Sequence, residues 1–170
     1  MKRATINKFI RKKNKTPIIC LTAYSKTIAK IADRYCDIIL VGDSLGMVLY
    51  GMKTTKEVKI DTMILHAKTV KNSAKKSLVV FDMPYKTYSN KFIAYKNARR
   101  VMKLTKCDAV KLEGGKEIVT IIKYLTLGIS VSRYISGTSV SRYLGISVSR
   151  YLGIFGTLTL ESTTNVAPNL

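Results

Sequence analysis

Apolar and polar residues recur along the first 127 positions with two periods, one typical of buried strands and one of amphipathic helices. Four apolar runs rich in Val, Ile and Leu have the length of strands buried on both faces. These predicted strands are Ile18 to Thr22, Ile38 to Val41, Leu78 to Phe81 and Ala109 to Leu112. Segments with apolar residues at helical spacing follow them. The predicted helices are Lys26 to Tyr35, Asp61 to about Ala74 with Asp61 as N-cap, Lys91 to Thr105, and Lys116 to Leu127.

This order of strand and helix predicts an α/β fold with a parallel sheet and right-handed crossovers. Two arrangements fit the pattern. The helices cover one face of the sheet, as in the N-terminal half of a (βα)8 TIM-type barrel, or they cover both faces of an open sheet.

The character of the sequence changes after Gly128. The segment Ser-Val-Ser-Arg-Tyr occurs three times, beginning at Ser130, Ser139 and Ser147. This spacing is shorter than that of known supersecondary repeats, and lysine is absent from Gly128 onward. The tail is either a small β-repeat module or a low-complexity extension that replaces a C-terminal half, and we favour the extension. The predicted division is therefore a truncated barrel half over residues 1–128 and a divergent repeat tail over residues 129–170.

The formal net charge of +20 raises the question of a nucleic-acid partner. Apart from a basic cluster in the first 17 residues, the lysines are spread over the predicted solvent faces of several helices. Because no recognition motif accompanies them, we favour solvated helix surfaces over nucleic-acid binding. The sequence also has no run of about 18 uncharged apolar residues and no secretory signal, which predicts a cytoplasmic protein with no membrane partner.

The cysteines Cys20, Cys36 and Cys107 are odd in number and widely spaced in apolar surroundings. That pattern favours buried, reduced thiols over disulfides or a zinc site.

Three acidic residues stand at the carboxyl ends of predicted strands, namely Asp43, Asp82 and Glu113. Parallel α/β folds place their ligand sites at this edge of the sheet. Carboxylates that converge there suit a hard divalent cation. An isolated Gly-Asp-Ser turn such as the one at Asp43 is more often a structural cap, so the recurrence at three strands carries the prediction.

Two neighbours add to this candidate site. Ser44 offers a hydroxyl and a backbone donor at a possible helix start. Lys111 precedes Glu113 by two positions, so both side chains point to the same side of a strand. A lysine buried there needs that carboxylate or an anionic substrate as its partner.

Four separated motifs resemble the ketopantoate hydroxymethyltransferase family over about Thr5 to Val131. They are Thr22 to Tyr24, Ile39 to Met47, Val79 to Pro84, and Val110 to Gly115. The resemblance implies an eight-stranded βα barrel. It also implies transfer of a hydroxymethyl group from 5,10-methylenetetrahydrofolate to 2-oxoisovalerate (3-methyl-2-oxobutanoate), giving ketopantoate in pantothenate biosynthesis.

The same resemblance assigns the site residues. It implies that Asp43, Asp82 and Glu113 surround Mg²⁺, and that Asp43, Ser44, Asp82 and Lys111 contact the small oxo-acid. Tyr24 would line the substrate pocket, or it is a packing residue. A homo-oligomer is expected if the family's assembly is retained.

The sequence departs from the family after Val131, where the repeats replace a Gly-His-Leu-Gly-Leu-like segment. Glu161 lies too close in sequence to Glu113 to be the family's general base, so the base is not identified. His66, the single histidine, is read as structural. The alternative to the enzyme is therefore a catalytically inactive remnant that at most binds the metal or the oxo-acid.

Overall fold

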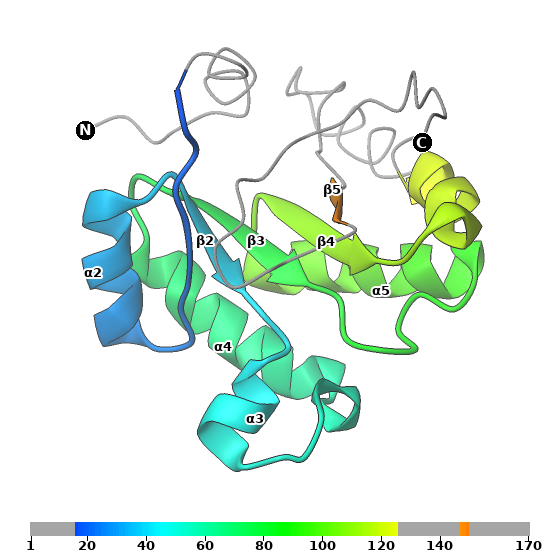
Figure 1. Ribbon diagram of the computed structural model, residues 1–170, viewed down its shortest axis with the longest axis horizontal. Coiled ribbons are helices and arrows are strands. Elements are labelled where there is room, and N and C mark those ends of the chain that lie inside the picture. Colours follow the sequence, from blue (N-terminus) through cyan, green and yellow to red (C-terminus); the bar gives the residue numbers. More distant parts are fainter. Residues whose placement is uncertain (1–15, 126–146, 150–170) are drawn as a thin grey trace, which may run out of the picture.

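The computed structural model describes residues 16–125 and 147–149. These residues include five strands that form one parallel sheet in the order β1-β2-β3-β4-β5 (Figure 1). The strands are β1 (Cys20–Thr22), β2 (Ile38–Val41), β3 (Leu78–Asp82), β4 (Ala109–Glu113) and β5 (Ser147–Ser149). Because spatial order follows sequence order, each connection joins neighbouring strands of the sheet.

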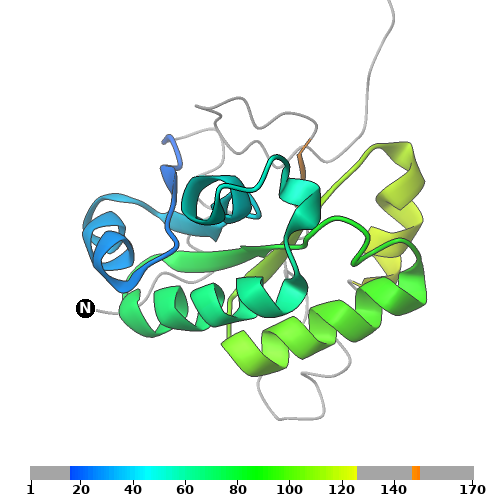
Figure 2. The same cartoon turned by 90° about the horizontal axis from the view of Figure 1, so that it is seen from below.

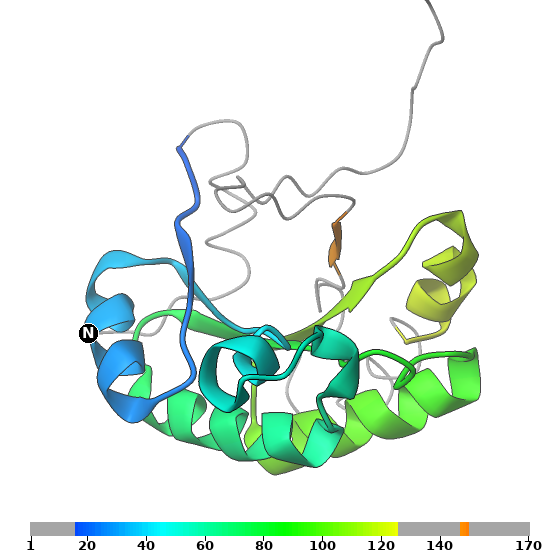
Figure 3. The ribbon, with the colours of Figure 1, turned by 60° about the horizontal axis from the view of Figure 1, so that its bottom comes forward.

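The helices lie mainly on one face of this sheet. They are α2 (Lys26–Tyr35), α3 (Leu45–Tyr50), α4 (Ile60–Ser73) and α5 (Lys91–Thr105), with 3-10 turns η1 (Thr55–Glu57) and η2 (Lys116–Ile118). Helices α2, α4 and α5 pack side by side against the same face (Figures 2 and 3). In the described part of the chain, the open-sheet arrangement with helices on both faces is therefore not observed.

The predicted α/β fold with a parallel sheet is confirmed, and α2, α5 and β2 have the predicted bounds. Strands β3 and β4 each extend one residue further than predicted, while β1 is shorter and begins at Cys20. The helix predicted from Lys116 begins as the turn η2, and residues 119–125 are helical. Apart from β5, the predicted repeat tail lies outside the described residues.

The predicted N-cap of α4 was wrong. The helix begins at Ile60, and its N-cap is Lys59, whose side chain makes no capping hydrogen bond. Asp61 lies instead within the first turn, where a carboxylate complements the helix dipole, and it pairs with Arg100 of α5.

Alternating side chains of the strands explain why the apolar runs are continuous. Ile39, Val41, Val79 and Phe81 are fully buried and join the main core with the helices. Ile38 and Leu78, which have the opposite parity, form a second, smaller cluster on the other face. Both faces of the central strands are thus covered, and each buried aliphatic or aromatic side chain contributes about 1.5–3 kcal/mol.

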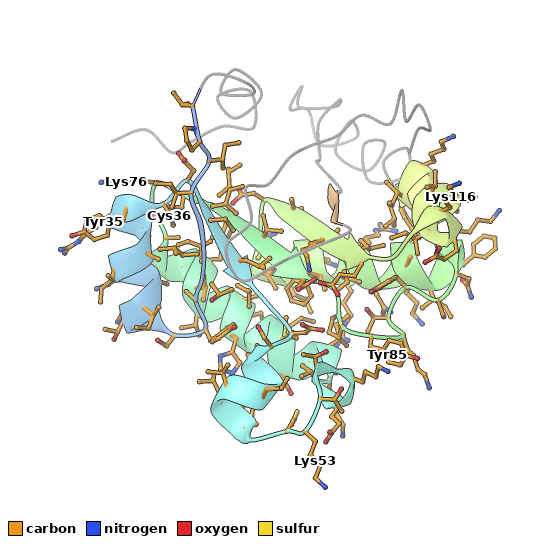
Figure 4. All side chains as sticks on the ribbon, in the orientation of Figure 1. Tyr35, Cys36, Lys53, Lys76, Tyr85 and Lys116 are labelled. Atoms are coloured by element: carbon orange, nitrogen blue, oxygen red, sulfur yellow. The ribbon has the colours of Figure 1, made fainter. Side chains whose placement is uncertain are left out.

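Several lysines lie at the surface of the described part, in agreement with the prediction that lysines occupy solvated helix faces. Figure 4 shows the labelled Lys53, Lys76 and Lys116 at the periphery of the described part. No helix within residues 16–125 is both long and apolar enough to cross a membrane. The three cysteines form no disulfide, and Cys107 is buried whereas Cys20 and Cys36 are only partly buried.

A buried carboxylate joins α2 to the loop before β3. Asp33 accepts hydrogen bonds from the backbone N–H groups of Lys75 at 2.8 Å, Lys76 at 3.0 Å and Ser77 at 2.7 Å. Burial alone would raise the pKa of Asp33, but these N–H donors outweigh it and hold that pKa below its usual value. The ionised form therefore stabilises the fold.

Asp33→Asn is expected to lower the free energy of unfolding by about 1–3 kcal/mol at neutral pH, since one acceptor oxygen is lost. The penalty should shrink below about pH 4, because the wild-type carboxylate loses its own contribution as the pH falls through its lowered pKa. Urea unfolding across this range measures both effects. The exposed Asp61→Asn is the matched control and should cost less than about 1 kcal/mol; an equal loss in both variants would contradict the role of Asp33.

Candidate functional site

The candidate site lies at the carboxyl ends of β3 and β4, where a buried lysine joins two predicted site carboxylates. The ammonium of Lys111 donates to both carboxylate oxygens of Asp82 at 2.9 Å and also to Glu113. The side chains of Lys111 and Asp82 are only 4% and 5% exposed, whereas that of Glu113 is 54% exposed. The predicted common side of Lys111 and Glu113 is thus confirmed by geometry.

Asp43, directly after β2, completes this group of charges. Its carboxylate accepts a hydrogen bond from the side chain of Thr55 in η1, and it lies near enough to Glu113 and Lys111 to feel both charges. Burial is the larger cause that raises the pKa of Asp43, and repulsion by Glu113 adds to it. The predicted residues of three different strands therefore share one site.

The site carries more negative than positive charge. Burial raises the pKa of Asp82 to about 7, although Lys111 acts in the opposite direction. Burial would lower the pKa of Lys111, yet its contacts with Asp82 and Glu113 raise it. One ammonium thus faces three carboxyl groups, and an added cation would relieve their mutual repulsion.

The donor set suits Mg²⁺ in one particular way. Among the described residues, no three His, Cys, Asp or Glu side chains form a group that could hold a metal ion by themselves. The ammonium of Lys111 lies between Asp82 and Glu113 and pairs with both. Mg²⁺ commonly takes only one or two carboxylates and fills its other positions with water or substrate oxygens. Asp43 and Asp82 fit this requirement.

Ser44 belongs to a second set of contacts beside the carboxylates. Its hydroxyl is hydrogen-bonded to the hydroxyl of Tyr24 at 2.7 Å. His66 Nδ1 lies 2.6 Å from the backbone oxygen of Tyr24, and His66 Nε2 lies 2.8 Å from the hydroxyl of Tyr50. His66 therefore contacts the site's neighbours rather than the site itself.

Glycines let α3 pack closely against the segment that follows it. A Cβ atom at Gly46 would lie 2.3 Å from Cγ2 of Val58 and 2.8 Å from the sulfur of Met52. At Gly42 it would lie 3.1 Å from the hydroxyl oxygen of Ser44. The Gly-Asp-Ser-Leu-Gly segment thus serves close packing as well as turn formation.

Three contacts of the site were not predicted from the sequence. They are Thr55 on Asp43, Tyr88 on the backbone of Glu113, and His66 on Tyr24. Each joins residues that are far apart in sequence or on a connecting turn, so no local pattern identifies them. The one local signal concerns Thr55, which directly follows Thr54, the N-cap of η1.

This fold and site are typical of parallel α/β proteins that place polar groups at the carboxyl ends of their strands. Within this class, the chain belongs to the ketopantoate hydroxymethyltransferase family, whose sequence profile matches residues 3–142.

Curated relatives agree with this assignment. A 3-methyl-2-oxobutanoate hydroxymethyltransferase of Pelagibacter ubique is 60% identical over 117 residues, covering 69% of this chain and 46% of the relative. Proteins of the same name from Rhizobium etli and Parvibaculum lavamentivorans are each 49% identical and cover 79% and 81% of this chain, and 50% and 51% of their own lengths. The chain spans about half the length of these relatives.

The ion pair predicts a pH-dependent loss of stability in Lys111→Met. Burial already raises the folded-state pKa of Asp82 to about 7 with Lys111 present, and without Lys111 this pKa should rise further. Between the unfolded pKa of about 4 and about pH 7, the wild type and the variant therefore lose stability in parallel. The extra loss of the variant grows above about pH 7, toward about 3–5 kcal/mol, as an ionised Asp82 stays buried without its partner.

Chemical denaturation at about pH 5 and about pH 8 tests this dependence, with the larger loss expected at the higher pH. The double variant Lys111→Met with Asp82→Leu is the control and should recover part of the loss, because no buried charge remains. A loss that is independent of pH would show that Asp82 does not need the ammonium.

The contacts of His66 fix which tautomer of its neutral ring is present. The backbone oxygen of Tyr24 can only accept, so Nδ1 carries the proton and Nε2 accepts from the hydroxyl of Tyr50. The chain has a single histidine, so ¹⁵N NMR of the untagged, uniformly labelled protein reports this ring without assignment. We expect the chemical shifts of the Nδ1–H tautomer; the usual Nε2–H pattern would contradict the observed contacts.

Proposed function

We propose that this chain performs the chemistry named for its relatives, hydroxymethyl transfer from 5,10-methylenetetrahydrofolate to 2-oxoisovalerate to give ketopantoate in pantothenate biosynthesis. The observation that carries the proposal is the group formed by Lys111, Asp82, Glu113 and Asp43 at the carboxyl edge of the sheet. Charged groups are costly to bury and are retained mainly where they bind or react.

The residues divide the binding of the oxo-acid between them. Lys111 supplies a buried positive charge for the substrate carboxylate, and Asp82 and Glu113 keep it ionised. Ser44 supplies a hydroxyl beside Asp43. These groups orient the substrate so that the C–H bond next to its carbonyl group faces the site.

We further propose that Asp43 and Asp82 are the protein ligands of Mg²⁺, and that Glu113 lies near it as the partner of Lys111. When bound, Mg²⁺ supplies Lewis acidity toward the oxygens of the oxo-acid. The raised pKa values of Asp43 and Asp82 support this assignment, since burial is their main cause and neighbouring carboxylates add to it, so a bound cation would favour both ionised forms.

The arrangement of the sheet supports the finer fold proposal. Strands in sequential parallel order, with α2, α4 and α5 on one face, are what the first βα units of a TIM-type barrel require. In this proposal, residues 1–128 supply those units, and Ser147–Ser149 of the repeat segment 129–170 adds the strand beside β4.

The first test is exchange of the C3 proton of 2-oxoisovalerate into deuterated water, followed by ¹H NMR with and without Mg²⁺. Exchange should depend on Mg²⁺ and should fall at least about tenfold in Asp43→Asn. Asp61→Asn removes a carboxylate of the same kind from the exposed surface of α4 and is the matched control. It should exchange like the wild type.

A folded chain that binds oxo-acid in the presence of Mg²⁺ but does not exchange the proton would support the inactive remnant instead. A chain that neither binds nor exchanges would overturn the proposed function. Calorimetric titration of 2-oxoisovalerate separates these two results.

A further inference from the structure

Helix α3 directly follows Asp43 and Ser44 of the candidate site, but it has few features that would keep it folded on its own. It spans only six residues, and Ser44, its N-cap, makes no side-chain capping hydrogen bond. Its last four residues are large, apolar and about half exposed: Met47, Val48, Leu49 and Tyr50. Isolated helices of this length are unstable in water, so contacts from elsewhere must fix it.

Each end of α3 is hydrogen-bonded to a different residue, and these two residues are hydrogen-bonded to each other. At the N-terminal end, the hydroxyl of Ser44 meets the hydroxyl of Tyr24. At the C-terminal end, the hydroxyl of Tyr50 meets Nε2 of His66. His66 then donates through Nδ1 to the backbone oxygen of Tyr24, which closes the loop. We call these four residues, Tyr24, Ser44, Tyr50 and His66, the α3 clamp.

The clamp draws on three separate parts of the fold. Tyr24 follows β1, Ser44 and Tyr50 flank and end α3, and His66 lies in the middle of α4. Because α4 packs against the sheet, its position is set by the core and not by α3. His66 therefore links the position of α4 to that of the short helix α3.

We propose that His66 is a positioning residue of the oxo-acid site: through the backbone of Tyr24 it fixes the hydroxyl of Ser44, and with it the turn that carries Asp43. The identity of the ligand rests on the proposed function. The clamp itself rests only on the three hydrogen bonds of 2.6–2.8 Å.

Two substitutions of His66 separate the two arms of the clamp. The amide nitrogen of Asn stands the same number of bonds from Cα as Nδ1, so His66→Asn keeps a donor for Tyr24 and loses the contact with Tyr50. The amide of Gln reaches as far as Nε2, so His66→Gln keeps the contact with Tyr50 and loses the donor to Tyr24. If His66 mattered only for packing, the effects of the two variants would not depend on which hydrogen bond each of them keeps.

The experiment combines two readouts on the full chain. Calorimetry measures the dissociation constant of 2-oxoisovalerate with Mg²⁺ present, and hydrogen exchange with mass spectrometry follows the amides of residues 45–50. We expect His66→Gln and Tyr24→Phe to weaken affinity roughly fivefold, as for loss of one hydrogen bond, and to speed exchange in α3. His66→Asn should retain wild-type affinity, with faster exchange confined to the C-terminal end of α3, where the contact with Tyr50 is lost.

Tyr35→Phe is the control for Tyr24→Phe, because it removes a hydroxyl from a tyrosine that is 69% exposed on α2. The thermal midpoint of each variant is recorded, so that a general loss of stability is not read as loss of positioning. Equal behaviour of His66→Asn and His66→Gln, or unchanged affinity and exchange in Tyr24→Phe, would overturn the proposal. If the wild type does not bind the oxo-acid, the proposed function fails, and hydrogen exchange alone then decides whether the clamp exists.

Discussion

The buried ion pair between Lys111 and Asp82 is the constraint around which the site is built. Both side chains are almost inaccessible to water, and each would be costly there without the other. Residues at the ends of neighbouring parallel strands are the simplest way to bring them together, because the sheet fixes their separation. The alternation along β4 then adds Glu113 on the same side. The register of β3 against β4, which pairs Asp82 with Lys111, is therefore part of the site as much as of the fold.

The strand ends could be predicted from the sequence, whereas the contacts around them could not. Continuous apolar runs locate β2, β3 and β4. Asp82 and Glu113 stand at the ends of β3 and β4, and Lys111 lies two positions before Glu113. A possible helix start at Ser44 was predicted, but the extent of α3 was not, because four consecutive apolar residues at its end do not follow the helical period. Its conformation depends on packing against Val58 and on contacts with distant side chains, which are properties of the assembled fold.

Rules based on residue type failed where the path of the backbone decides at which residue a helix begins. Asp61 has a favourable cap residue type, but the N-cap lies two positions earlier, at the extended Lys59. The same limitation applies to His66, whose partner Tyr24 lies 42 positions away. A lone histidine on a helix gives no sign of the carbonyl oxygen that it contacts, so the prediction of a structural role for His66 could not name its partners.

Strand β1 lies at the end of the described sheet, with Leu21 and Thr22 largely open to solvent. Unpaired strand edges are templates on which other chains can assemble, and natural proteins limit this risk by keeping such strands brief. At three residues, β1 offers few free backbone groups to a neighbouring molecule. The short length of β1 therefore acts against intermolecular β-pairing. A designed lengthening of this strand would be expected to make the sheet more regular but the protein less soluble.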